Sequence, residues 1–182
     1  MTKRKRRNML TWVVVLVLVI LALPAEAHPH REIRAWPVAD DAQTIQLEKE
    51  GAYRGRVRAA EICELVDSSR LKAPEATMAW CGLIGENLFH WGKLNLYRTQ
   101  HVVNFVDCES RGFAGAQNPG SSAAGLGQFV TPFRDHRALR YLGRPVKSWY
   151  DGPDNLVVTV GLYVDQGDRH WPNCGKLRPT TS

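Results

Sequence analysis

Between about residue 50 and residue 110, apolar residues recur at helical spacing. The pattern predicts helices over residues 54–69, 75–89 and 97–110, and a shorter helix around residues 40–49. Pro74 fits the first turn of the helix that follows it. The stretch 97–110 has the clearest apolar stripe, formed by Val102, Val103, Phe105 and Val106. We therefore expect it to be a buried helix.

The second half of the chain alternates between turn-rich and apolar segments. Residues 113–125 are rich in Gly, Ala, Ser, Asn and Pro, which predicts a small hairpin or an irregular loop after a left-handed helix stop at Gly112. A helix is predicted over residues 132–142. Residues 155–166 form either a core helix or, because β-branched residues favour sheets, a strand. The expected fold class is mostly α.

The N-terminus has the three-part pattern of a secretory signal peptide. Basic residues at positions 3–7 precede an apolar run over residues 10–23, and Ala25-Glu26-Ala27 fits a cleavage site. The run is shorter than the ~20 residues that span a bilayer comfortably. Residues 1–27 are thus predicted to be a signal peptide, with an uncleaved membrane anchor as the alternative. Both place the remaining chain outside the cytoplasm.

Export changes how the net charge is interpreted. The whole chain carries a formal charge of +6, but residues 1–27 hold five of its basic residues and one acidic residue, so the remainder carries only +2. The basic character belongs mostly to the targeting signal. It therefore does not indicate nucleic-acid binding.

The chain has four cysteines, Cys63, Cys81, Cys108 and Cys174. An even number in an exported protein favours two disulfides, for which three pairings are open. Free buried thiols are the alternative. A zinc site is disfavoured because no Cys-x-x-Cys or Cys-x-x-His spacing is present. We expect no metal and no cofactor.

Glu109 is the candidate for chemistry. It lies near the C-terminus of the predicted helix 97–110, where the helix dipole disfavours negative charge, and it is close to apolar Phe105 and Phe113 in the sequence. Both influences raise the pKa of a carboxyl, whereas Arg111 would lower it by pointing inward. A raised pKa suits a general acid. By residue pattern alone, a solvated glutamate at a helix end is the more common outcome.

Two motifs resemble known families. Glu109-Ser110, followed by Asn118-Pro119, Ser121 and the run Ala123-Ala124-Gly125-Leu126-Gly127-Gln128-Phe129, is similar to the active-site signature of the lysozyme-like lytic transglycosylases. Cys108-Glu109-Ser110-Arg111-Gly112 and the later Trp171-Pro172-Asn173-Cys174 resemble the resuscitation-promoting factor domains, which share the lysozyme-like fold. The later Tyr-Asn-x-Gly element of larger transglycosylases is missing, and Tyr163 is its nearest substitute.

The resemblance implies a lysozyme-like α+β fold and roles for individual residues. Glu109 would be the general acid and then the general base, and Ser110 would help to orient it. The glycan groove would be lined by Gln128 and by the backbone of Gly125, Leu126 and Phe129, with Tyr163 as a further candidate. The resemblance also implies that Cys108 pairs with Cys174, which leaves Cys63 with Cys81.

The predicted organisation has five parts. A signal peptide (1–27) precedes a linker or N-terminal extension (28–53) and an accessory helical region (54–96). The transglycosylase-like domain covers residues 97–175, and a short tail covers 176–182. The expected function is cleavage of peptidoglycan strands by a secreted or envelope-located monomer, with membrane contact only through the signal or anchor. The alternative is a non-catalytic glycan-binding wall protein on the same fold.

Overall fold

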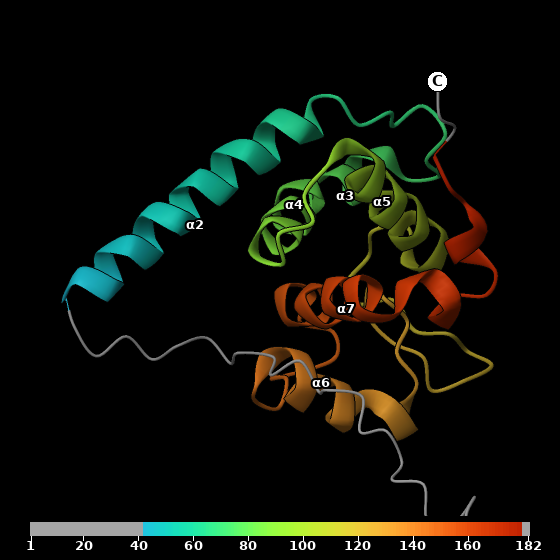
Figure 1. Cartoon of the computed structure of the whole chain (residues 1–182). Helices are drawn as coiled ribbons and strands as arrows, with labels where there is room; N and C mark the ends of the chain where they lie inside the picture. The colour runs from blue at the N-terminus through green and yellow to red at the C-terminus, as the bar shows by residue number, and fades with distance from the viewer. Residues whose placement is uncertain (1–41, 180–182) are drawn as a thin grey trace, which may run out of the picture. The chain divides into compact units, whose positions relative to one another are not determined.

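The computed structural model describes residues 42–179, which are mostly helical, and this confirms the prediction of a mostly α chain (Figure 1). The α-helices are α2 (Ala42–Cys63), α3 (Pro74–Met78), α4 (Cys81–His90), α5 (Leu96–Ser110), α6 (Arg134–Leu142) and α7 (Gly152–Gln166). Short 3₁₀ helices are η1 (Thr131–Phe133), η2 (Gly167–His170) and η3 (Cys174–Lys176). The predicted signal peptide lies outside the described residues. No described helix is both long and apolar enough to cross a membrane.

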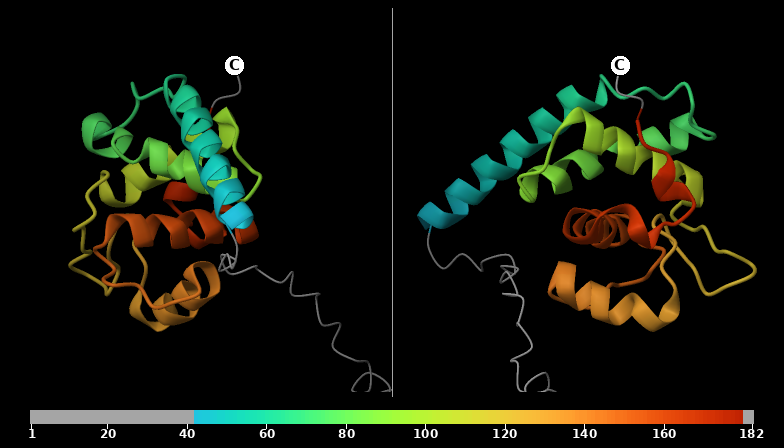
Figure 2. Two further views of the ribbon diagram at one scale, coloured as in Figure 1. Left: turned by 90° about the vertical axis from the view of Figure 1, so that its left-hand side faces the viewer. Right: turned by 45° about the vertical axis from the view of Figure 1, so that its right-hand side comes forward.

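The helices are layered around α7. In Figures 1 and 2, α7 lies between α6 on one side and α4 with α5 on the other, and α2 crosses the outer side of α4. The interior is filled by fully buried apolar side chains from these elements, among them Ile84, Leu88, Val102, Phe105, Leu156 and Leu162. Burial of each such side chain contributes about 1.5–3 kcal/mol. Packing of apolar faces therefore accounts for most of the helical stability.

Helix α2 is tied closely to α4. Ala59 of α2 is fully buried, and a Cβ added to Gly85 of α4 would lie only 2.7 Å from the Ala59 Cβ. A disulfide joins Cys63, the last residue of α2, to Cys81, the first residue of α4, with their Cα atoms 5.9 Å apart. Small residues and a covalent bond thus hold the two helices at short range.

Residues 155–166, for which the sequence predicted either a helix or a strand, form a helix. Helix α7 begins three residues earlier, at Gly152, and the side chain of Asp151 caps it by accepting a hydrogen bond from the Asp154 N–H. Pro153 occupies the first turn, where its missing N–H is not needed. Gly152-Pro153-Asp154, which by sequence reads as a break between elements, is therefore a helix start. Burial on nearly all sides explains the β-branched run.

Other boundaries differ from the sequence pattern. Helix α2 runs without interruption through residues 53 and 54, where the pattern placed the end of a linker, and it stops at Cys63 rather than at residue 69. The predicted helix 75–89 is divided into α3 and α4 by a turn at residues 79–80. The pattern missed these points because helix ends depend on tertiary contacts that short-range periodicity does not contain.

Candidate active site

Glu109 occupies the last turn of α5, at the point where the chain leaves the core. The helix ends when Arg111 adopts a left-handed conformation (φ 52°) and its N–H bonds to the carbonyl of Asp107. Gly112 follows with φ 68°, so the left-handed stop predicted at Gly112 involves two residues. This turn directs the chain away from the helix axis immediately after Glu109.

The Glu109 carboxyl is half-buried, and burial raises its pKa above the ordinary value of 4.5. Among residues 42–179 it has no hydrogen-bond or ion-pair partner, and its oxygens are not sealed from solvent. Arg111 is exposed and does not lower the pKa. Burial is one of the two causes predicted from the sequence.

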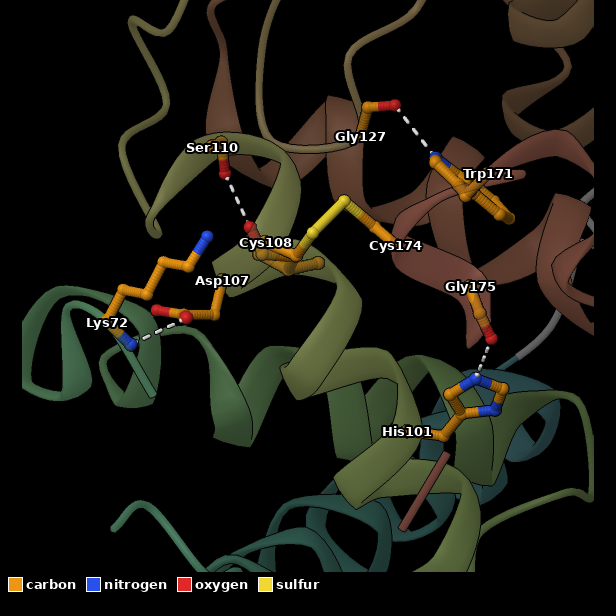
Figure 3. Close-up of a disulfide and its surroundings, with 10 residues drawn as sticks. Lys72, His101, Asp107, Cys108, Ser110, Gly127, Trp171, Cys174 and Gly175 are labelled. Atoms are coloured by element: carbon orange, nitrogen blue, oxygen red, sulfur yellow. Dashed lines mark hydrogen bonds between the residues drawn. A yellow bond between two sulfur atoms is a disulfide. The ribbon is translucent and has the colours of Figure 1, made fainter. Parts of the chain in front are cut away.

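The face of α5 that carries Glu109 packs against the chain end. Phe105 lies one turn before Glu109, and its ring stacks on the ring of Trp171 with centroids 4.5 Å apart. The indole N–H of Trp171 donates to the carbonyl of Gly127 at 3.0 Å, and the Cys108–Cys174 disulfide lies beside this contact (Figure 3). These bonds bring residues 125–129 to the C-terminal half of α5.

Residues 113–130 form an irregular loop with two isolated antiparallel bridges, Gln117 with Ala124 and Ala124 with Phe129. The predicted alternatives of hairpin and irregular loop therefore resolve to the loop. Gln128 holds it from within, because its side-chain N–H group donates to the carbonyls of Gly125 at 2.8 Å and Ala116 at 3.2 Å.

Gly125 and Asn155 fix the turn against α7. Gly125 has a φ of 77°, and an added Cβ would lie 2.1 Å from the Asn155 side-chain nitrogen. The Asn155 amide donates to the carbonyl of Trp149 at 3.0 Å and accepts from the N–H of Gly127 at 2.8 Å. Asn155 was not among the predicted site residues. Its signal in the sequence is a single amide at the start of an apolar run.

The structure places the predicted groove residues in different environments. Leu126 is 0% exposed and Phe129 is 2% exposed, so both side chains belong to the core and only their backbone can face a ligand. The hydroxyl of Ser110 donates to the carbonyl of Val106, one turn earlier in α5. It is thus occupied with its own helix rather than with the Glu109 carboxyl.

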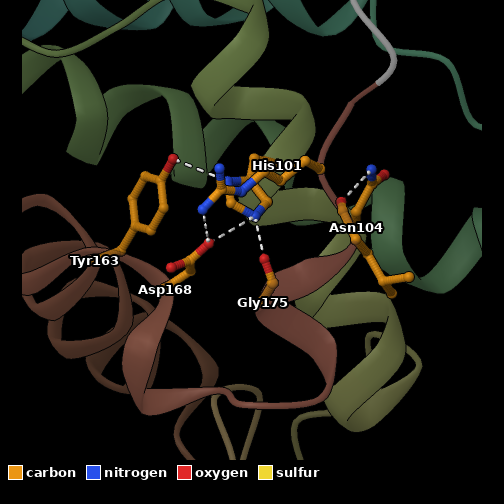
Figure 4. A network of polar contacts seen from close by, with 7 residues as sticks. His101, Asn104, Tyr163, Asp168 and Gly175 are labelled. Atoms are coloured by element: carbon orange, nitrogen blue, oxygen red, sulfur yellow. Dashed lines mark hydrogen bonds and ion pairs between the residues drawn. The ribbon is translucent and has the colours of Figure 1, made fainter.

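Tyr163 lies in a separate buried network (Figure 4). Its hydroxyl contacts Nδ1 of His101 at 3.2 Å, and Nε2 of His101 donates to the carbonyl of Gly175 at 2.8 Å. Asp168 lies 3.8 Å from the same nitrogen. His101 precedes Glu109 by two helical turns, about 12 Å along the axis, so this network anchors the chain end to the other half of α5.

Asp107 is the buried acid of this region, and it holds α3 to α5. Its carboxylate accepts hydrogen bonds from the N–H groups of Lys72 and Ala73, at 2.7 and 3.0 Å, and from the Thr77 hydroxyl at 2.8 Å. The two N–H groups belong to residues just before α3, and the hydroxyl lies within it. Asp107 therefore points away from the Glu109 side of the helix, as its spacing predicts.

Three further carboxylates are candidates for a second acid or base by availability. Asp151 caps α7, and Asp154 forms a two-pronged ion pair with Arg144 at 2.7 and 2.9 Å, which lowers the pKa of Asp154. Asp135 is exposed in the first turn of α6. The described residues contain no group of three or more His, Cys, Asp or Glu side chains that could hold a metal ion.

Both disulfides implied by the family resemblance are present, Cys63–Cys81 and Cys108–Cys174. The prediction of two disulfides is therefore confirmed. Bonds of this kind are typical of an oxidising, extracytoplasmic compartment. A surface hollow lined by Lys49, Glu50, Tyr53 and Arg54 of α2 contains none of the predicted site residues.

Residues 42–179 therefore form a helical, disulfide-bonded domain in which Glu109, near the end of a buried helix, is half-buried and has no partner among these residues. Compared with the models of known families, with characterised proteins and with solved structures, the chain has no match. The functional assignment therefore depends on the site itself.

Proposed function

We propose that the chain is an exported peptidoglycan-cleaving enzyme that acts on the β-1,4 bond between N-acetylmuramic acid and N-acetylglucosamine, as a lytic transglycosylase. The observation that carries the proposal is Glu109. It is a carboxyl with a pKa raised by burial, without a partner among residues 42–179, and open to solvent. An acid that protonates a glycosidic oxygen near neutral pH needs these properties.

The proposed reaction uses Glu109 twice. The protonated carboxyl gives its proton to the leaving glycosidic oxygen as the bond to the anomeric carbon breaks. The N-acetyl group of the same sugar stabilises the positive charge that develops at that carbon. The Glu109 carboxylate then removes the proton from the sugar's 6-hydroxyl, whose oxygen bonds to the anomeric carbon and closes a 1,6-anhydro ring.

The supporting features concern geometry around Glu109. The chain leaves α5 directly after it, and the loop 113–130 is fixed to α7 by Asn155 and to the chain end by Trp171. Backbone groups of Gly125–Phe129 are thereby held in one conformation, which suits recognition of an extended sugar strand. Asp151 and Asp154 are occupied in capping and in an ion pair. A mechanism with one carboxyl and substrate assistance fits that distribution.

The test is digestion of purified peptidoglycan by the full chain, with soluble products analysed by mass spectrometry. Products about 18 Da (one water) lighter than reducing muropeptides are expected. Glu109→Gln should lower the rate by about 10²–10⁴-fold. Glu64→Gln, at an exposed position just after α2, is the matched control and should remain active.

Two outcomes would redirect the assignment. Products with reducing ends would show hydrolysis by water and replace the transglycosylase by a lysozyme-type enzyme. Absence of products from the unmodified chain, with retained binding to the wall, would overturn the enzymatic proposal in favour of a glycan-binding wall protein.

A further inference from the structure

Arg137 of α6 is a half-buried cation without an anion. Its guanidinium carbon lies 5.3 Å from the ring centroid of Phe129 and 5.2 Å from that of Phe133. Among residues 42–179 it has no carboxylate within ion-pair distance. Burial lowers the pKa of this guanidinium. Arginines in such positions commonly pair with a carboxylate.

His170 of η2 holds the guanidinium from one side. Nη2 of Arg137 donates to Nδ1 of His170 at 3.2 Å, and Nε2 of His170 donates to the side-chain oxygen of Gln166 at 2.7 Å. Nδ1 can accept only when the ring is neutral. Burial and the charges of Arg137 and Arg169 lower the pKa of His170, which favours that state.

The remaining donors of Arg137 reach solvent. Within the described chain, the one side-chain polar atom that is buried without a hydrogen bond is Nε of Arg140. The unused N–H groups of Arg137 are therefore accessible to a ligand from outside. They lie beside Phe133, whose side chain is 52% exposed.

The surrounding charge is positive. Arg169 is exposed next to His170, and the guanidinium of Arg134 donates to two backbone carbonyls, those of Phe129 and Ser122. Asp165, near the end of α7, is engaged by Arg140 at 2.8 Å and by the hydroxyl of Tyr141 at 2.9 Å. Asp135 is exposed two residues before Arg137 and forms no ion pair within residues 42–179.

We propose that Arg137, braced by His170 between Phe129 and Phe133, binds the free carboxylate of a peptide that has small apolar side chains. A guanidinium edge matches the two oxygens of a carboxylate, and the exposed Phe133 ring gives the adjacent aliphatic groups an apolar surface. The choice of peptide depends on the proposed function, because the peptide stems of peptidoglycan carry free carboxylates. Arg137 would thus recognise the peptide part of the substrate whose glycan part reaches Glu109.

The test is a titration of the full chain, followed by NMR, with N-acetyl-Ala-Ala and with the same dipeptide amidated at its C-terminus. The free acid is expected to bind at least ~10-fold more tightly than the amide, because only the acid forms a charge-assisted hydrogen bond with the guanidinium. Arg137→Gln should abolish this preference, and Arg137→Lys should retain only part of it. Arg56→Gln, which removes an exposed charge from α2, is the control and should change nothing.

Phe133→Ala gives a second variant at an exposed position, where folding is not at risk, and it should weaken binding of the free acid several-fold. Three results would overturn the proposal: equal binding of acid and amide, unchanged binding by Arg137→Gln while its melting temperature is normal, or competition by inorganic phosphate as strong as by the dipeptide. The titration requires no cleavage. A chain that binds the dipeptide without cutting peptidoglycan would therefore refute the proposed enzyme and leave the carboxylate site standing.

Discussion

The indole of Trp171 and the carbonyl of Gly127 form a 3.0 Å hydrogen bond between segments that lie 44 residues apart in the chain. The same indole is stacked on Phe105, one turn before Glu109. Trp171 thereby connects the candidate acid's helix to the loop that is proposed to hold the glycan. The Cys108–Cys174 disulfide fixes this connection from the neighbouring turn.

Trp171→Phe should keep the stacked ring and lose the hydrogen bond. The Gly127 carbonyl would be left buried without its donor, at a cost of about 1–3 kcal/mol in the free energy of unfolding. We also expect slower peptidoglycan cleavage, because the loop would lose its fixed position. Urea unfolding and the product assay measure the two effects. Trp91→Phe is the control, since the Trp91 indole N–H has no hydrogen bond within residues 42–179; an equal loss of stability there would contradict the argument.

Gly125→Ala should be strongly destabilising. The φ of 77° disfavours any side chain, and the new Cβ would lie 2.1 Å from Asn155 and 2.2 Å from the carbonyl of Trp149. The free energy of unfolding should therefore fall by at least ~2 kcal/mol. Gly82→Ala is the opposite case, because Gly82 lies in α4 with no atom within 4 Å of its added Cβ. The free energy of unfolding of that variant should rise by about 0.5–1 kcal/mol. Thermal unfolding of both variants measures the two effects, and a Gly125→Ala variant as stable as the unmodified chain would contradict the turn described at Gly125.

The sequence pattern predicted the helical class, the buried α5 and the end of α5 at Ser110, because these depend on periodicity and on local stop signals. It did not find the continuity of α2, since that helix is stabilised by its close contact with α4 through Ala59 and Gly85. Contacts between distant segments leave no periodic trace in a single sequence.

For the same reason, the sequence predicted only part of the candidate site. The motif singled out Glu109 and the backbone of residues 125–129, but it did not show that the side chains of Leu126 and Phe129 belong to the core. Asn155 and Trp171 position that loop from 28 and 44 residues away. Their roles follow from the fold rather than from local pattern.

Asp107→Ala should separate α3 from α5. It removes the acceptor of two backbone N–H groups and of the Thr77 hydroxyl, all of which come from the segment before or within α3. Unsatisfied donors cost about 1–3 kcal/mol each when they stay buried, so a loss of roughly 3 kcal/mol is expected after partial solvation. Denaturant unfolding measures it. Asp135→Ala, at an exposed position in α6, should change stability by less than ~0.5 kcal/mol.

The two disulfides should differ in their effect on function. The first bond joins cysteines 66 residues apart and the second joins cysteines 18 residues apart. By loop entropy, removal of the Cys108–Cys174 bond should lower the free energy of unfolding by about 4 kcal/mol, and removal of the Cys63–Cys81 bond should lower it by about 3 kcal/mol. Replacement of the first pair by serine should also reduce cleavage, because it frees the segment that carries Trp171. Replacement of the second pair should leave cleavage by the folded fraction unchanged. The measurement is the cleavage rate of each variant, corrected for its folded fraction. Equal losses of cleavage in the two variants would contradict the special role of the Cys108–Cys174 bond.

The pH dependence of Glu109 provides a test of stability and activity together. Burial raises its pKa in the folded chain, so the native state binds this proton more tightly than the unfolded state does. The resulting stabilisation is complete below the unfolded pKa and is lost as the pH rises through the folded pKa. Glu109→Gln carries no charge at any pH. Its stability relative to the unmodified chain should therefore increase as the pH rises above the ordinary glutamate value of 4.5.

Cleavage by the unmodified chain should fall over the same pH range, because the general acid loses its proton there. Urea unfolding at a series of pH values and initial rates of product release give the two curves, with Glu64→Gln as the control that should follow the unmodified chain. Coincidence of the two midpoints above 4.5 would link the buried proton to the chemistry. A flat stability difference with a normal rate profile would show that Glu109 titrates like a solvated side chain, and would remove the physical basis for its role as the acid.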